Sequence, residues 1–117
     1  MIKGMGIDLV DLDRIREIAD DRFIHRILSK DEYKIYENIA DETTKITFLG
    51  GRFAAKEAIF KAISKGEGTA YYTDFSVLSD DHGKPYVVSE FFGEDDIVHI
   101  TITHTATHAI CYALIEG

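Results

Sequence analysis

The sequence predicts an α+β domain in which a long helix packs against an antiparallel sheet. Residues 43–64 have the pattern of one long helix, and the apolar segments after them have the length of strands. Residues 105–108 join the last two of these strands as a hairpin, which makes them antiparallel neighbours. The helical first half and strand-rich second half are joined without a repeat, a low-complexity run or a linker, so we expect a single domain over residues 1–117.

The first predicted element is a strand within residues 1–13, where the sequence alternates. One face carries Met5, Ile7 and Leu9, and the other carries Gly4, Gly6 and Asp8. Glycine inside a strand often marks the close approach of a ligand or of another backbone. Two alternatives stay open here. The glycines leave a track for a ligand beside Asp8, or they accommodate a packed helix while Asp8 caps a turn.

Three helices are predicted next. Residues 11–18 begin with acidic side chains, which favour a helix N-terminus, and residues 29–32 (SKDE) form a capping box that opens a helix at 31–38. The long helix over 43–64 contains Gly50 and Gly51, each costing about 1 kcal/mol relative to alanine. Close packing or the approach of a ligand would account for them.

The predicted strands of the second half are residues 75–78, 86–88, 98–103 and 109–115. The last one is apolar on both faces, which predicts a central position in the sheet. In the strand before it, His104 continues the apolar face of Val98, Ile100 and Ile102. This histidine is either a core residue with satisfied hydrogen bonds or a donor to a phosphate group.

Glu57 is the first candidate functional residue. At 100° per residue it falls beside Phe53 and Phe60 on the long helix, with Lys61 next on the same flank. A carboxylate withdrawn from water must be paired, hydrogen-bonded, protonated or bound to a metal. Lys61, four residues on, is the nearest candidate partner. The helix alone therefore allows either an internal ion pair or a metal site. Asp8 would be the second carboxylate of such a metal site.

Composition excludes several classes of protein. With 21 acidic and 13 basic residues the formal charge is −8, whereas a nucleic-acid-binding protein is expected to carry a basic footprint. The single cysteine, Cys111, lies in an apolar strand and allows no internal disulfide, which favours a reducing, intracellular setting. We find no apolar stretch of about eighteen residues and no basic-then-apolar leader. We therefore expect a cytoplasmic protein with no nucleic-acid or membrane partner.

These segments together resemble the holo-acyl-carrier-protein synthase family of small phosphopantetheinyl transferases. The matching residues, in the family's order and spacing, are 6–10 (GIDLV), 48–49 (FL), 51–58 (GRFAAKEA), 61–62 (KA), 83–86 (GKPY) and 102–105 (ITHT). The resemblance covers nearly the whole chain. It implies a 4'-phosphopantetheinyl transferase-like fold and a homotrimer with active sites between neighbouring subunits.

The resemblance also implies the reaction. Such an enzyme moves the 4'-phosphopantetheine arm of coenzyme A onto a serine of apo acyl carrier protein, for fatty acid biosynthesis, and releases adenosine 3',5'-bisphosphate. The transfer depends on Mg²⁺. Two other functions stay open: a non-catalytic module that binds coenzyme A or a carrier protein, and another Mg²⁺-dependent phosphotransferase on the same scaffold.

Family positions suggest the role of each candidate residue. Asp8 and Glu57 match the metal-binding acids, and Glu57 is also the first candidate for the base that deprotonates the carrier serine. Lys61 is expected to neutralise a phosphate oxygen. Arg52 and His104 match positions that hold coenzyme A phosphates, and Lys45 is expected at the adenosine end.

An acidic carrier protein requires a local basic surface on this acidic chain. Arg14 and Arg22 match the family's docking arginines, and Arg26 follows Arg22 by one turn if that segment is helical. Acidic residues interspersed along the same segment could instead neutralise it. Two stretches depart from the family pattern: residues 43–45 (TTK) retain one basic residue, and residues 64–67 (SKGE) place Lys65 and Glu67 near the expected phosphates.

Overall fold

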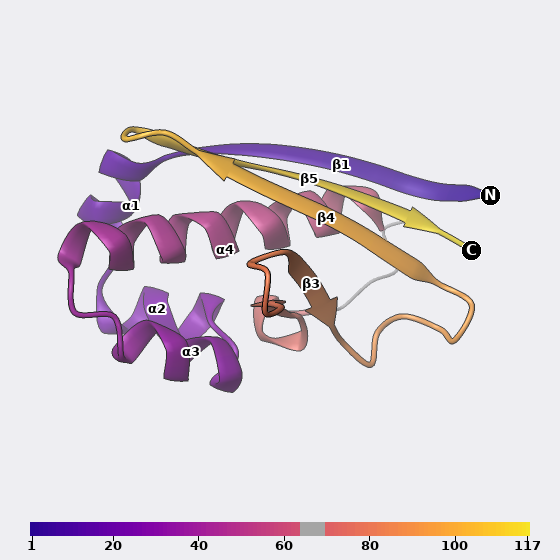
Figure 1. The fold of residues 1–117 in the computed structure, drawn as a ribbon, viewed down its shortest axis with the longest axis horizontal. Coiled ribbons are helices and arrows are strands. Elements are labelled where there is room, and N and C mark those ends of the chain that lie inside the picture. The colour runs from indigo at the N-terminus through magenta and orange to yellow at the C-terminus, as the bar shows by residue number, and fades with distance from the viewer. Residues whose placement is uncertain (64–69) are drawn as a thin grey trace.

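The long helix α4 lies between a three-stranded antiparallel sheet on one side and two short helices on the other (Figure 1). The computed structural model describes residues 1–63 and 70–117. Its elements are β1 (Ile2–Asp11), α1 (Leu12–Ile18), α2 (Asp21–Ile27), α3 (Lys30–Glu37), α4 (Glu42–Ala62), the 3₁₀ helix η1 (Tyr72–Asp74), β2 (Ser76–Ser79), β3 (Pro85–Val88), β4 (Ile97–His104) and β5 (His108–Glu116). The predicted α+β class is confirmed.

The larger sheet has the order β1-β5-β4, so the predicted central position of β5 is confirmed. The predicted hairpin is also confirmed, and the Thr105 amide donates to the His108 carbonyl at 2.8 Å. Strands β2 and β3 pair with each other in a separate two-stranded sheet. The four predicted strands of the second half therefore divide between two sheets.

Local capping sets where each helix begins. Asp11, Asp20 and Asp41 accept hydrogen bonds from backbone amides in the first turns of α1, α2 and α4. The predicted capping box is present, since Ser29 and Glu32 bond reciprocally at the start of α3. Helix α4 begins one residue before the predicted start, and Ser64, the predicted end, lies outside the described residues.

Gly4 and Gly6 admit helix α4 against β1. A Cβ atom on Gly4 would lie 1.8 Å from the carbonyl oxygen of Ala62, and one on Gly6 would lie 2.0 Å from that of Ala58. These two glycines therefore serve helix packing, and the alternative of a ligand track is wrong for them. Gly50 also serves close packing, because its Cβ would meet the Leu12 side chain at 2.4 Å.

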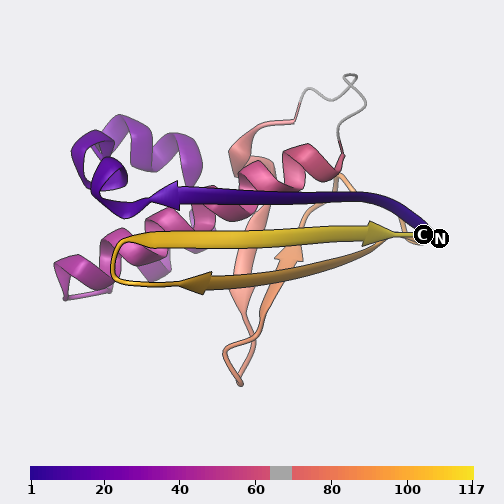
Figure 2. The same cartoon turned by 90° about the horizontal axis from the view of Figure 1, so that it is seen from above.

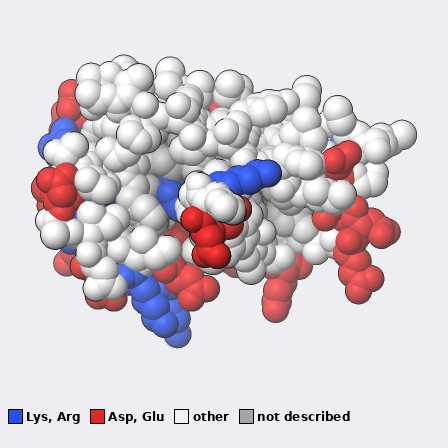
Figure 3. All heavy atoms as spheres, in the orientation of Figure 1, with Lys and Arg blue, Asp and Glu red and all other residues white. Residues whose placement is uncertain are grey.

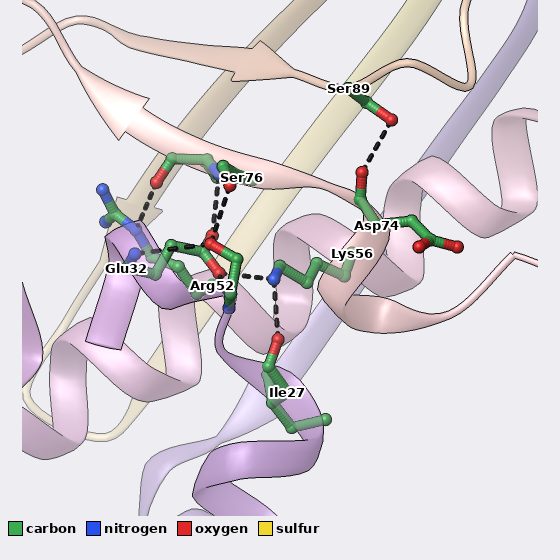
Figure 4. A network of polar contacts seen from close by, with 9 residues as sticks. Ile27, Glu32, Arg52, Lys56, Asp74, Ser76 and Ser89 are labelled. Atoms are coloured by element: carbon green, nitrogen blue, oxygen red, sulfur yellow. Dashed lines mark hydrogen bonds and ion pairs between the residues drawn. The ribbon is translucent and has the colours of Figure 1, made fainter. Parts of the chain in front are cut away.

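A buried ion pair joins α3 to α4 (Figure 4). Lys56 and Glu32 are both fully buried, and the Lys56 ammonium donates to Glu32 Oε1 and, at 2.6 Å, to the Ile27 carbonyl. Glu32 also accepts from the backbone amides of Ser29 and Val77. Burial lowers the pKa of Lys56, while the charge of Glu32 acts in the opposite direction. This network ties α2, α3, α4 and β2 together.

The two faces of the larger sheet differ. Its inner face packs on α4 and includes Cys111, which is 1 % exposed and whose thiol pKa burial raises to about 12. On the outer face Met5, Ile7 and Leu9 are 57 %, 55 % and 61 % exposed. The predicted alternation of β1 is therefore confirmed, but its larger side chains are the ones that face outward. A single chain leaves this apolar surface uncovered.

The two termini lie together at one end of the sheet, where the Gly117 amide donates to the Met1 carbonyl at 2.9 Å (Figure 2). Acidic side chains gather near the β3–β4 connection at the same end, while a group of basic side chains protrudes near α2 and α3 (Figure 3). Among the helices of the described residues, none has the length and apolar character needed to cross a bilayer.

Replacement of Gly6 by alanine is expected to lower the free energy of unfolding by about 1–3 kcal/mol, because the new methyl group collides with backbone of α4. Urea denaturation measures this. Gly51→Ala is the matched control. Its Cβ would meet Ile102 at an ordinary 3.5 Å, and alanine favours the helix, so stability should hold or rise. Equal stability of Gly6→Ala and the unsubstituted protein would contradict the close packing.

The Lys56→Met variant is expected to lose roughly 3–5 kcal/mol of stability, because it leaves the buried Glu32 carboxylate without its cation. The same change at exposed Lys34 is the control and should cost little. The double variant Glu32→Gln with Lys56→Met should lose less than the two single losses added together. Strict additivity in urea denaturation would contradict a coupled pair.

Candidate active site

Glu57 lies half-buried on α4, as its neighbours Phe53 and Phe60 predict. Its Oε2 atom accepts a hydrogen bond of 3.0 Å from the hydroxyl of Tyr72 in η1. The Tyr72 ring packs on both phenylalanines, with centroids 5.9 Å from Phe53 and 5.1 Å from Phe60. The apolar flank of α4 thus carries a carboxylate that is held by a phenol.

Asp8 reaches the same helix from β1. The Lys61 ammonium donates to Asp8 Oδ1 at 3.1 Å and to the Ile7 carbonyl at 2.9 Å. Lys61 therefore pairs with Asp8, and the alternative of an internal Glu57–Lys61 ion pair is wrong. The physical reason is the closeness of β1, which offers Lys61 both a carbonyl and a carboxylate. The cap alternative for Asp8 is also wrong, because Asp11 caps α1.

Both acids influence the pKa of Tyr72. Burial raises the pKa of Tyr72 most, and the hydrogen bond to Glu57 and the negative charges of Glu57 and Asp8 raise that pKa further. Arg26 acts in the opposite direction. The phenol is thus a stable hydrogen-bond donor at neutral pH. Of the two carboxylates that the sequence assigns to a metal, Glu57 bonds to this phenol directly and Asp8 acts on it through its charge.

The donor set fits a magnesium ion. In residues 1–63 and 70–117, Asp8 bonds to protein only through Oδ1 and Glu57 only through Oε2, so each keeps a carboxylate oxygen available. No cluster of three or more metal-binding side chains exists in that part of the chain. Mg²⁺ keeps several waters and is usually held by one or two carboxylates. A site of two acids therefore satisfies its requirements.

Arg52 and His104 lie together in a different place, a groove of about 220 Å³ between the first half of α4 and the end of β4. Arg52 Nε donates to the Val77 carbonyl at 3.0 Å, and its guanidinium lies 4.1 Å from the Phe48 ring centroid. Burial lowers the pKa of Arg52, while Glu32 raises it. His104 is exposed rather than a core residue.

The other predicted cations are more dispersed. Lys45 Nζ lies over the Tyr36 ring at 5.0 Å and is absent from the lining of the Arg52 groove. Lys65 and Glu67, which the sequence places near the expected phosphates, lie outside the described residues. A single chain thus pairs Asp8 with Lys61 one turn beyond Glu57, on the second half of α4, and places Arg52 with His104 in a groove along its first half.

The candidate docking arginines are exposed on two short helices, Arg14 on α1 and Arg22 and Arg26 on α2. Helical spacing of Arg22 and Arg26 is confirmed. Arg14 pairs with Glu17 at 3.6 Å, so the interspersed acids do offset part of this basic surface. The Arg26 guanidinium lies 5.9 Å from the Tyr72 ring centroid, which connects α2 to the carboxylate site.

Two side-chain contacts were not predicted from the sequence. Tyr72 comes from a short 3₁₀ turn ahead of β2, and nothing in its local pattern pointed to Glu57. The pairing of Lys56 with Glu32 was missed as well, although flanking alanines at 54, 55 and 58 were a signal that Lys56 is buried. Both contacts depend on tertiary structure.

Comparisons with known proteins identify the family of this chain. The model of the 4'-phosphopantetheinyl transferase superfamily matches residues 4–113. A holo-[acyl-carrier-protein] synthase of Acholeplasma laidlawii is 50 % identical over 116 residues, covering 99 % of this chain and 98 % of that protein. One from a Geobacillus species is 43 % identical over 119 residues, covering 99 % of this chain and 98 % of that protein.

A crystal structure of a holo-(acyl-carrier-protein) synthase from Bacillus anthracis in complex with CoA (3',5'-ADP) superposes with a TM-score of 0.88 at 35 % identity, covering 98 % of this chain and 96 % of that one. A second, from Neisseria meningitidis, has a TM-score of 0.85 at 26 % identity and covers both chains fully. Sequence and fold therefore agree, and the chain belongs to the 4'-phosphopantetheinyl transferase superfamily.

Proposed function

We propose that this protein transfers the 4'-phosphopantetheine arm of coenzyme A to a serine of apo acyl carrier protein and releases adenosine 3',5'-bisphosphate. The observation that carries the proposal is similarity over the full length to holo-[acyl-carrier-protein] synthases, up to 50 % identity. The crystal structure of such a synthase with coenzyme A supports coenzyme A as co-substrate. The whole chain, residues 1–117, would act as one domain in the cytoplasm.

Asp8 and Glu57 are proposed to hold a Mg²⁺ ion through the carboxylate oxygens that make no contact with protein in the described residues. When bound there, the ion supplies charge stabilisation for the leaving bisphosphate. Lys61 is the cation next to this pair. In the free protein it is neutralised by Asp8, and it can turn toward a phosphate oxygen because its side chain is more than half exposed.

Arg52, His104 and Lys45 are proposed to bind the phosphates and the adenosine end of coenzyme A. Contacts to Val77 and Phe48 hold the Arg52 guanidinium in place at the groove, which lowers the cost of ordering it around an anion. His104 can donate a hydrogen bond beside it. Glu57 is also the first candidate for the base that accepts the proton of the carrier serine, but this role ranks second to holding the cation, because both roles need the same carboxylate oxygen.

A homotrimer is proposed because a single chain separates the two parts of the candidate site and leaves an apolar surface exposed. Glu57 and Lys61 lie on the second half of α4, whereas the Arg52 groove runs along its first half. The outer face of β1, with Met5, Ile7 and Leu9, is apolar and exposed. Association through that face would cover it and let the groove of one subunit meet the carboxylates of its neighbour. Closed cyclic symmetry would give each subunit the same contacts.

Intact-mass analysis of an apo acyl carrier protein tests the reaction. With coenzyme A and Mg²⁺ the carrier should gain one phosphopantetheine arm, and a chelator should prevent the gain. Glu57→Gln should abolish transfer, because the amide loses the charge that binds the cation yet can still accept from Tyr72. Its far-ultraviolet circular dichroism should match the unsubstituted protein. Undiminished transfer by Glu57→Gln would remove this carboxylate from the reaction.

Arg14→Ala is expected to weaken carrier binding about ten-fold while leaving coenzyme A binding unchanged, because Arg14 is exposed on α1 and does not line the Arg52 groove. Titration of each ligand separately measures this. Lys34→Ala, which removes an exposed cation from α3, is the control. The effect should fade as salt is raised. An equal loss for both ligands would contradict a docking role.

A further inference from the structure

The Tyr72 side chain occupies a position between the candidate metal site and the candidate docking helix. Its hydroxyl donates to Glu57 Oε2 at 3.0 Å. Its ring contacts Phe53 and Phe60 on α4, and the Arg26 guanidinium of α2 lies 5.9 Å from its centroid. Three contacts on the ring and one on the hydroxyl fix this residue.

Ring packing alone does not require a hydroxyl group, since a phenylalanine would make the same contacts with Phe53 and Phe60. What the hydroxyl adds is a directed bond to one oxygen of Glu57. A glutamate has several rotatable bonds and can point its carboxylate in many directions. A bond to Oε2 restricts those directions and leaves Oε1 as the oxygen that makes no protein contact in the described residues.

We propose that Tyr72 is a positioning residue that holds the Glu57 carboxylate so that its second oxygen is available to a divalent cation. This inference rests on the proposed function, because it assumes that Glu57 binds the cation. Tyr72 would then act through Glu57, without touching the substrate. Outer contacts of this kind typically change metal affinity by about 10–100-fold when removed.

Tyr72→Phe and Tyr71→Phe form a matched pair for the test, because each removes one phenolic hydroxyl from the same short segment. Tyr71 is 71 % exposed, whereas the Tyr72 hydroxyl bonds to Glu57. Mn²⁺ is the probe, since it prefers the same oxygen ligands as Mg²⁺ and its free ion is counted by electron paramagnetic resonance. Binding is measured on the full-length protein without carrier, first with Mn²⁺ alone and then with coenzyme A added.

Tyr72→Phe is expected to weaken Mn²⁺ binding by about ten-fold or more, with a melting temperature close to that of Tyr71→Phe, which should bind Mn²⁺ normally. In the transfer assay, raising Mg²⁺ should restore the kcat of Tyr72→Phe, since the lost affinity is compensated by mass action. A purely structural role would not produce this recovery. Unchanged Mn²⁺ affinity in Tyr72→Phe would overturn the proposal, as would the absence of Mn²⁺ binding by the unsubstituted protein.

The outcomes separate this inference from the proposed function. Normal arm transfer by the unsubstituted protein, together with unchanged Mn²⁺ affinity in Tyr72→Phe, would overturn the positioning role alone. Weakened Mn²⁺ binding in Tyr72→Phe, together with no transfer to any apo carrier by the unsubstituted protein, would support the positioning role and overturn the proposed reaction.

Discussion

The contact between β1 and α4 is the constraint on which the site depends. Because Gly4 and Gly6 lack side chains, the strand lies directly on the backbone of the helix. That closeness lets Lys61 reach the Ile7 carbonyl and Asp8 together. It also brings Asp8 within electrostatic reach of the phenol that holds Glu57. A side chain at either glycine would push the strand outward and separate the two acids. Gly4 and Gly6 are therefore needed both for the packing of β1 on α4 and for the placement of Asp8 beside the helix.

Much of the fold follows from local sequence. The capping box at Ser29 and the hairpin before β5 are each encoded within a few residues, so the sequence predicts them correctly, and it predicts the start of α4 to within one residue. Contacts that join distant segments are different. Lys61 has a carboxylate four residues before it on its own helix, yet it pairs with Asp8, 53 residues away. Helical spacing identifies possible neighbours, but it carries no information about which strand will lie against the helix.

The buried pair of Lys56 and Glu32 illustrates the same limit. The capping box predicts that Glu32 bonds to the Ser29 amide, and that bond is present. It does not predict that the other oxygen of Glu32 accepts from Val77, or that a lysine from α4 completes the arrangement. Charged residues are stable in such a place only because every polar atom is satisfied, and no buried side-chain nitrogen or oxygen lacks a partner in the described residues. The same network orients β2, whose Val77 carbonyl holds Arg52.

The burial of Cys111 has a consequence for regulation. A thiol with a pKa of about 12 is ionised in roughly one molecule in 10⁵ at neutral pH, and only the ionised form reacts readily with oxidants or disulfides. Since it is the single cysteine of the chain and is 1 % exposed, the folded protein offers no accessible thiol for glutathione or a thioredoxin to modify. Thiol–disulfide exchange at Cys111 would therefore require the fold to open around it.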